Sequence, residues 1–421
     1  MEAIEKKIVE AVDVYADDIL DLTSRLVAEP STLGNEASAL KVMEDEFIKL
    51  SFEPVRVPID PVKLSEHPGF AKVPWSYKDR FNLVATRAAN GKGGYSALFN
   101  GHLDVVSEQP IDLWNTDPYQ PIVKDGWMYG RGSGDMKSGL AAMVYAVKAI
   151  DAAGLGLKAP VIMEAVIEEE CCGNGALACL DAGYDADAVL IPEFTGLKIM
   201  MGQLGILWFK ISVSGKPAHV MDAQAGVNAI EKCYPVIAAL RRLEKEMNKE
   251  THPGYANCKH PIILNIGIIK GGNWPSSIPA AAEFDCRLSF FPDKTYKQTC
   301  SRIIDTINQC AMTDPWLSKK PPEIQFYGFR SEGHSIEDDL PAFRVIADCH
   351  QDIIEYPVEK IHFTCTTDVR AFHCYGQSQA TCYGPVTRNV HAADECVEIE
   401  SVISTAKVYA LFLSRWCGLV E

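Results

Sequence analysis

The sequence predicts an α/β fold: a larger domain with a mixed, mostly parallel sheet flanked by helices, and an inserted α+β domain of ferredoxin-like type. Two observations lead to this prediction. Almost continuous apolar runs, typical of strands buried on both faces, alternate with helical periods through the first 195 residues. From Leu197 onward the order changes to strand–helix–strand–strand–helix, which is typical of a compact α+β unit.

The sequence pattern of the first half of the chain predicts the parallel sheet. Helical periods occupy residues 3–28 and 35–52, and a further helix is expected over 135–154, where Gly154 ends it. Strands are expected in the apolar runs at 81–87, 95–106, 161–169 and 185–193. Because a helix separates strands of this half, we expect right-handed crossovers between parallel strands.

The second half supplies the inserted unit and the return to the first domain. The expected elements are, in order, strand 206–215, helix 225–250, strands 261–272 and 281–292, and helix 294–312. After a break at "DPWLSKKPP", the segment "SQATCYGP" reads as one more core strand. We therefore predict one discontinuous domain over residues 1–196 and 313–421, with residues 197–312 inserted.

Composition narrows the classes of function. The 421 residues carry a formal net charge of −16, which argues against a nucleic-acid partner, because phosphate binding needs a basic surface. No apolar stretch reaches the roughly 18 residues that span a bilayer, and no secretory signal is visible, so we expect no membrane partner. The 14 cysteines form no CxxC pair and no regular framework, which favours reduced thiols and a cytoplasmic location.

One short stretch needs an explanation. The apolar run "VIMEAVIEEECC" ends on Glu168, Glu169 and Glu170, followed by two thiols. Three adjacent carboxylates repel one another, and burying them unpaired is costly, so a positive group should face them. The ordinary interpretation is a solvated loop rich in glutamate, and the alternative is a metal site.

Other polar side chains stand where core strands end. His102 and Asp104 lie two residues apart on one strand face, a spacing that suits a metal-binding imidazole beside a carboxylate. Asp135 begins a helix, where aspartate is also an ordinary N-cap. Glu193 closes a strand, and His391 follows the last core strand. Their joint placement at the carboxyl ends of strands, where open α/β sheets bind ligands, favours one common site.

The residue types predict a metal site with two ions. Two histidines with several carboxylates, and no cysteine requirement, suit Zn²⁺, Co²⁺ or Mn²⁺. The carboxylates outnumber the ligands that one ion needs, so we expect two divalent ions about 3.5–4 Å apart, bridged by one carboxylate. Zn²⁺ is the first expectation, and Co²⁺ and Mn²⁺ are the alternatives.

These ordered motifs resemble a known family. The segments "NGHLDVV", "YGRGSGDMKSG", "IEEE", "PE" and "GP…H" are similar, in order and spacing, to those of the M20 family of metallo-aminoacylases and peptidases. The resemblance runs from about residue 20 to the C-terminus, and "VPWSYKDRFNLVA" looks like the deacylase branch. It implies a catalytic domain with an inserted lid, and a homodimer formed through residues 197–312.

The resemblance also implies a role for each residue of the metal site. The implied metal ligands are His102, Asp135, Glu170, Glu193 and His391. Asp135 would bridge the two ions, and a cis peptide bond follows this position in the family. Glu169 would be the general base, and Asp104 would orient the His102 ring. Glu168 stands where the family has an aspartate.

Four further residues match substrate positions of the family. "TCTTDVRAF" places Arg370 where an arginine commonly grips a substrate carboxylate. "SGKPAHV" places His219 where a histidine reaches the neighbouring subunit's active site and stabilises the oxyanion. Asn273 and Arg287 match positions that line the site in some members.

These expectations lead to one function and several alternatives. We expect a dinuclear-metal hydrolase that cleaves a C–N, amide-type bond of a small carboxylate-bearing substrate, first of all an N-acyl amino acid. The alternatives are a dipeptidase or carboxypeptidase, an aromatic amine hydrolase, and a non-catalytic binding homologue, although a binder needs no general base such as Glu169. Departures from the family pattern at Cys171, Phe194, Val369 and Val386 remove no implied ligand and bear on the substrate instead.

Overall fold

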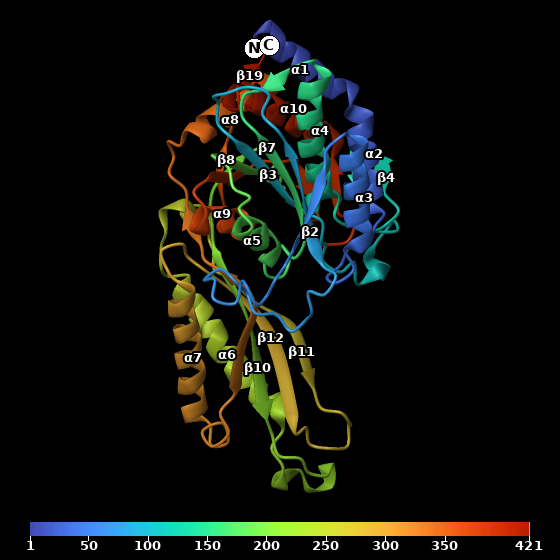
Figure 1. Cartoon of the computed structure of the whole chain (residues 1–421). Helices are drawn as coiled ribbons and strands as arrows, with labels where there is room; N and C mark the ends of the chain where they lie inside the picture. The colour runs from blue at the N-terminus through green and yellow to red at the C-terminus, as the bar shows by residue number, and fades with distance from the viewer. Residues whose placement is uncertain (421) are drawn as a thin grey trace.

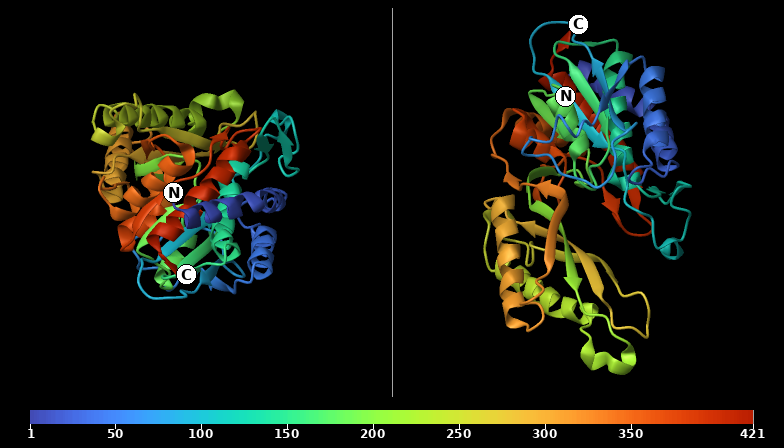
Figure 2. Two further views of the ribbon diagram at one scale, coloured as in Figure 1. Left: turned by 90° about the horizontal axis from the view of Figure 1, so that it is seen from above. Right: turned by 60° about the horizontal axis from the view of Figure 1, so that its bottom comes forward.

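The chain folds into two lobes joined end to end. The computed structural model describes residues 1–420. In Figure 1 the larger lobe, at the top, holds both termini, and the smaller lobe below it is built from the middle of the chain. The right-hand view in Figure 2 shows the same division from another side. The predicted α/β class, with an inserted α+β unit, is confirmed.

A six-stranded mixed sheet forms the centre of the larger lobe. Its strands are, in sheet order, β1 (Pro54–Pro58), β2 (Phe81–Arg87), β7 (Val161–Val166), β3 (Ala97–His102), β8 (Ala188–Ile191) and β16 (Gln379–Cys382). The pairs β7–β3, β3–β8 and β8–β16 are parallel, whereas β1–β2 and β2–β7 are antiparallel. Every residue of β3 is buried, as expected for a strand covered on both faces.

Helices cover both faces of this sheet. One face packs against α4 (Ser138–Ala152) and α10 (Ile399–Trp416), where the rings of Phe99 and Tyr409 lie 4.7 Å apart. On the other face Val84 and Val166 pack against Cys179 of α5. The remaining helices of the larger lobe are α1 (Ala3–Val14), α2 (Ala16–Val27), α3 (Ala37–Lys49), α5 (Asn174–Asp181), α8 (Pro341–Ile354) and α9 (Val369–Tyr375).

Three smaller sheets complete the larger lobe. The first consists, in sheet order, of β14 (His334–Ser335), β9 (Ile199–Gln203) and β15 (Lys360–Phe363). The second consists of β17 (Thr387–Arg388), β18 (Cys396–Glu398), β5 (Trp127–Tyr129) and β4 (Ile122–Lys124). The third pairs β19 (Leu419–Val420) with β6 (Gly156–Leu157). The pairing of β18 with β5 ties the segment after β16 to the segment before α4. Each of the two segments carries part of the candidate site.

The smaller lobe is a four-stranded antiparallel sheet with two helices on one face. Its elements are, in sheet order, β11 (Leu264–Gly271), β12 (Ala281–Phe290), β10 (Gly205–Ser214) and β13 (Glu323–Ser331), with α6 (Ala229–Met247) and α7 (Tyr296–Thr313). The predicted strand–helix–strand–strand–helix order is confirmed. The fourth strand, β13, comes from beyond residue 312, and the predicted division of the chain at residues 197 and 312 stays a prediction.

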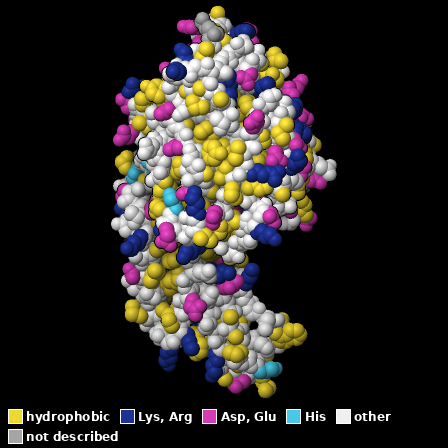
Figure 3. Space-filling view, in the orientation of Figure 1, with side chains coloured by type: hydrophobic (Ala, Val, Ile, Leu, Met, Phe, Trp, Pro, Cys, Tyr) yellow, Lys and Arg dark blue, Asp and Glu magenta, His cyan; other side chains and the backbone are white. Residues whose placement is uncertain are grey.

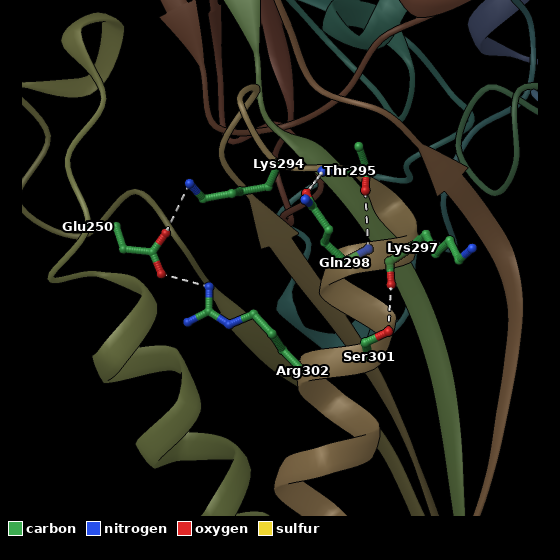
Figure 4. A pocket seen from close by; sticks show the side chains of 7 residues that line it. All are labelled: Glu250, Lys294, Thr295, Lys297, Gln298, Ser301 and Arg302. Atoms are coloured by element: carbon green, nitrogen blue, oxygen red, sulfur yellow. Dashed lines mark hydrogen bonds and ion pairs between the residues drawn. The ribbon is translucent and has the colours of Figure 1, made fainter.

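The start of α7 follows directly from its sequence. The Thr295 hydroxyl accepts a hydrogen bond from the Gln298 backbone N–H, and the Gln298 side chain accepts one from the Thr295 N–H, which is a capping box (Figure 4). Glu250, just beyond α6, contacts Lys294 and Arg302 at 3.6 and 2.7 Å and so fixes the two helices side by side.

Two boundaries differ from the sequence expectation. The helix predicted from Asp135 begins at Ser138, and residues 133–137 form the separate turn η2 (Ser133–Lys137). The strand predicted over 161–169 ends at Val166, so the three glutamates lie beyond the strand in a turn, where Glu168 has a φ of 70°. No helix within residues 1–420 is long and apolar enough to cross a membrane.

One buried carboxyl in the sheet generates a stability prediction. Glu164 of β7 is fully buried and accepts a hydrogen bond of 2.8 Å from the Asn100 amide. Burial raises the pKa of Glu164 to about 8. Because the folded chain then holds this proton more tightly than the unfolded chain, stability falls as the pH rises from about 4.3 to about 8.

Glu164→Gln removes this titration. We compare the free energy of unfolding of the variant with that of the natural chain at each pH. The difference in favour of the variant should be about 3 kcal/mol larger at pH 8 than at pH 5. Denaturant titrations at the two pH values measure the difference, with Glu53→Gln as an exposed control. An equal effect of Glu164→Gln at both pH values would contradict the assignment.

Candidate active site

The carboxyl ends of three neighbouring parallel strands bring the candidate residues together. His102 is the last residue of β3, Glu169 and Glu170 follow the end of β7, and Glu193 follows the end of β8. Since β7 and β8 both pair in parallel with β3, these side chains share one edge of the sheet. All but Glu170, which is partly buried, are buried.

Asp135 lies at the centre of the cluster. Its Oδ1 atom is 3.0 Å from Nε2 of His102, and its Oδ2 atom is 3.1 Å from Nε2 of His391. Glu193 Oε1 lies 3.8 Å from the same His102 nitrogen, and Glu170 Oε1 lies 2.9 Å from the His391 nitrogen. Each oxygen of Asp135 therefore belongs to a different group of one histidine and one glutamate.

A second carboxylate holds the loop that carries Asp135. Glu395 accepts hydrogen bonds from the backbone N–H groups of Gly134 and Asp135, at 3.0 and 3.1 Å, and pairs with Arg131 at 2.5 Å. Glu395 lies next to β18, whose pairing with β5 connects the His391 loop to the Asp135 loop. The peptide bond between Asp135 and Met136 is cis.

Asp104 contacts the turn of glutamates rather than the ring of His102. Its carboxylate accepts hydrogen bonds from the backbone N–H groups of Glu169 and Glu170, at 3.2 and 3.1 Å. Nδ1 of His102 lies 2.9 Å from the Asp104 backbone carbonyl but 3.8 Å from its carboxylate. The carbonyl therefore orients the ring, and the carboxylate fixes the turn that presents the two glutamates.

Glu169 is a buried carboxylate without a hydrogen-bond partner on Oε1, in the part of the chain that the structure describes. The nearest cation is Arg370, whose Nη1 atom lies 3.9 Å away. Burial, with the nearby Asp368 carboxylate, raises the pKa of Glu169 well above its usual value. A carboxylate held in this way accepts a proton readily, which is the property that a general base needs.

The charges of the cluster do not balance. It contains five carboxylates, Asp104, Asp135, Glu169, Glu170 and Glu193, but two imidazoles. Burial and the Asp135 carboxylate raise the pKa of Glu193 well above its usual value. Although burial opposes it, Glu170 and Asp135 raise the pKa of His391 to about 11. Divalent cations relieve such an excess of buried negative charge, and His102, Asp135 and Glu170 offer ligand atoms within 4.8 Å of one another.

The first of the three adjacent glutamates has a different environment. Glu168 is fully buried, and its carboxylate pairs with Arg80 and accepts hydrogen bonds from Trp75 Nε1 and Tyr77 Oη at 2.6 and 2.7 Å. The thiol of Cys172 lies 3.0 Å from the same carboxylate. The sequence predicted a positive group near the glutamates but did not identify Arg80 as the partner of Glu168.

A cavity of about 630 Å³ opens beside the cluster, between the two lobes. Glu169, Glu170 and His391 line it from the larger lobe, and Trp208 and Arg287 line it from the open face of the smaller sheet. Figure 3 shows the surface hollowed between the lobes. A small molecule in this cavity reaches the acidic cluster and the smaller lobe at once.

The predicted substrate residues fall in different places. Arg287 lines the cavity, whereas Arg370 is buried beside Glu169 and donates a hydrogen bond to Thr366 at 3.1 Å. His219 and Asn273 are exposed on the smaller lobe and do not line the cavity of their own chain. The turn η3 (Val220–Ala225), which His219 caps, lies at the end of this lobe away from the larger lobe (Figure 1).

Comparisons with known proteins find sequence relatives over most of the chain. The N-formyl-4-amino-5-aminomethyl-2-methylpyrimidine deformylase of Bacillus subtilis is 29% identical over 373 residues, which cover 83% of this chain and 86% of that protein. The acetylornithine deacetylase of Pasteurella multocida is 26% identical over 348 residues, which cover 81% of this chain and 85% of that protein.

A solved structure matches the fold of this chain, and a family profile matches its sequence. The dipeptidase Dug1p from Saccharomyces cerevisiae superimposes with a TM-score of 0.79 at 14% identity, covering 99% of each chain, which shows a shared fold. The sequence profile of peptidase family M20/M25/M40 matches residues 98–415. The chain therefore belongs to peptidase family M20/M25/M40 and is a metal-dependent hydrolase.

Proposed function

We propose that this hydrolase removes an acyl group from the nitrogen of a small N-acylated compound, using two divalent ions. The observation that carries the proposal is the buried Glu169 carboxylate, which has a free oxygen beside the His102–Asp135–His391 cluster. Two sequence relatives are named a deformylase and a deacetylase, which supports an acyl–nitrogen bond.

Two groups of ligands, sharing Asp135, would hold the ions. His102, Asp135 and Glu193 form one group, and Asp135, Glu170 and His391 form the other. Nitrogen and oxygen donors of this kind fit Zn²⁺ first, with Co²⁺ and Mn²⁺ as alternatives. The separate use of the two Asp135 oxygens supports a bridging role for this carboxylate.

The protein groups divide the chemistry of hydrolysis among them. Bound divalent cations supply acidification of water and polarisation of a carbonyl oxygen. Glu169 takes the proton from the attacking water and delivers it to the leaving amine, as general base and then general acid. Asp104 holds the backbone of the turn that carries Glu169, and Arg370 lies 3.9 Å from its carboxylate.

We also propose that the smaller lobe, residues 197–312 in the predicted division, forms a homodimer. His219 is exposed and lies outside the cavity of its own chain, so it would act in the site of the neighbouring subunit, as an oxyanion donor with Asn273 beside the same site. The apolar side chain of Ile269 on the edge strand β11 is about half exposed, at 54%, which supports burial against a second copy.

The substrate is proposed to carry a carboxylate, for which Arg287 in the cavity is the better placed of the two candidate arginines. Peptide hydrolysis is the second candidate, because the fold matches a dipeptidase. All 14 cysteines are unpaired in the structure, which supports the proposed cytoplasmic location.

Substitutions of the two glutamates at the proposed ion site should have different effects on turnover and on bound metal. Glu169→Gln removes a proton carrier but no ligand, so we expect kcat to fall by about 10²- to 10⁴-fold while bound metal stays near the natural level. Glu170→Gln, the matched variant one residue away, loses metal as well. Steady-state kinetics with metal analysis measure both, and loss of metal from Glu169→Gln instead would mean that the two roles are exchanged.

Removal of metal predicts a reversible loss of turnover. Dialysis against a chelator abolishes hydrolysis, and added Zn²⁺, Co²⁺ or Mn²⁺ restores it, because these residues alone do not acidify water sufficiently. Titration of the metal-free protein by calorimetry counts the ions. Saturation at a single ion per chain, with full activity, would argue against the dinuclear site.

His219 predicts complementation between subunits. His219→Ala lowers kcat without loss of folding, whereas Met221→Ala, an exposed neighbour at 88%, has no effect. Mixing His219→Ala with Glu169→Gln subunits restores activity, because one site of a mixed dimer then has both groups. Failure to complement in dimers that are proven to exchange subunits would remove the cross-subunit role.

A further inference from the structure

The open face of the smaller sheet forms one wall of the cavity. Along β10, Leu207, Phe209 and Ile211 face α6 and α7 and belong to the core of the smaller lobe. Because side chains alternate along a strand, Ile206 and Trp208 point the other way, and both line the cavity. The strand therefore presents an indole to the space beside Glu169.

An irregularity in β13 gathers further rings around Trp208. In the pairing with β10, Trp208 faces Tyr327 while Leu207 faces Arg330, so two extra residues of β13 bulge outward. Gly328 in this bulge has a φ of 60°, and a Cβ atom there would lie 2.7 Å from the indole. Glycine thus lets the backbone pass under the ring.

The bulge brings two aromatic side chains to the same side of the sheet. The Tyr327 and Phe329 rings lie 6.1 and 5.1 Å from the Trp208 ring, inclined at 65° and 80°. Both line the cavity together with Trp208. Edge-to-face contacts of this kind hold the indole in place, and Trp208 also packs against Ala71, Cys171 and Cys172 of the larger lobe. The part of this aromatic wall that lines the cavity is the surface that another flat, apolar ring would contact.

A cation lies directly beside this aromatic wall. Arg287 of β12 is the cross-strand partner of Trp208 and lines the same cavity. Its Nη2 atom donates to the Thr364 carbonyl at 3.1 Å, and no carboxylate of residues 1–420 forms an ion pair with it. Asp285, on the same strand face, instead accepts a hydrogen bond of 2.6 Å from the Tyr327 hydroxyl. Burial lowers the pKa of Arg287, so an anion in the cavity is the partner that this guanidinium lacks.

The two features fit one class of molecule. We propose, on the basis of the proposed function, that the substrate is an N-acylated aromatic amino acid, whose ring packs against Trp208 and whose carboxylate pairs with Arg287. In such a molecule a single CH₂ group separates the ring from the carbon that bears the carboxylate. Direct cross-strand partners have Cβ atoms about 5 Å apart, which matches this short spacing.

The scissile bond of this molecule reaches the acidic cluster. Glu169, Glu170 and His391 line the same cavity as Trp208 and Arg287. The oxygen of water bonds to the acyl carbon, the C–N bond breaks, and the electron pair of that bond stays on nitrogen. The nitrogen takes a proton through Glu169, so the products are a carboxylate and the free aromatic amino acid.

Three N-acetyl compounds distinguish the contribution of the ring contact with Trp208 from that of the carboxylate contact with Arg287. They are N-acetylphenylalanine, N-acetylalanine, which lacks the ring, and N-acetylphenethylamine, which lacks the carboxylate. With the full-length, Zn²⁺-loaded protein we expect kcat/KM for N-acetylphenylalanine to exceed that for N-acetylalanine by about 10-fold. It should exceed that for N-acetylphenethylamine by about 100-fold, because the charged pair with Arg287 is desolvated.

Substitutions assign each preference to its residue. Trp208→Ala should lower the ratio of kcat/KM for N-acetylphenylalanine to that for N-acetylalanine from about 10 to about 1, whereas Trp208→Phe should retain most of this ratio. Arg287→Met should lower the ratio of kcat/KM for N-acetylphenylalanine to that for N-acetylphenethylamine from about 100 to about 1. Arg242→Met, an exposed arginine on α6, is the matched control without effect.

A binding measurement separates this inference from the proposed function. Metal-loaded Glu169→Gln protein should bind N-acetylphenylalanine more tightly than N-acetylalanine by calorimetry, even when turnover is absent. Hydrolysis of N-acetylalanine at the same efficiency would overturn the inference and leave the proposed function standing. Turnover of none of the three compounds by the natural protein, with no binding to the variant, would overturn both.

Discussion

An excess of buried negative charge around Asp135 is the constraint on which the site depends. The fold gives cationic partners to the acidic side chains that support the site, since Arg131 pairs with Glu395 and Arg80 pairs with Glu168. Within residues 1–420, the carboxylates that converge on Asp135 receive no such partner beyond two imidazoles and the more distant Arg370. The arginines therefore neutralise the supporting carboxylates, and the proposed ions would neutralise the inner ones.

The three adjacent glutamates illustrate how one turn serves three purposes. Glu168 faces inward to Trp75, Tyr77 and Arg80, and its positive φ turns the backbone out of the direction of β7. Glu170 contacts His391. Glu169, between Glu168 and Glu170 in the sequence, has no hydrogen-bond partner within residues 1–420 on its Oε1 atom. Because Asp104 holds the backbone N–H groups of both later residues, the divergence of the side chains is built into the turn itself.

The local pattern of the sequence was sufficient for the framework and for the convergence of polar residues. Buried parallel strands have a distinctive apolar run, and their carboxyl ends must meet, so the position of His102 relative to Glu193 follows from topology. The sequence pattern does not predict side-chain contacts between segments that are far apart in the chain. Arg80 lies 88 residues from Glu168, and whether Arg370 faces the cavity or the interior depends on the packing around Gly173, where a Cβ atom would collide with its guanidinium.

The two lobes contribute different residues to the cavity, and this division has a consequence for the size of the ligand. Glu169, Glu170 and His391 belong to the larger lobe, whereas the indole, the bulge and Arg287 belong to the smaller lobe. A ligand that contacts both walls must extend from the acidic cluster to the open face of the smaller sheet. The separation of the two lobes therefore limits ligand length, since a molecule too short for this separation loses one of the two sets of contacts.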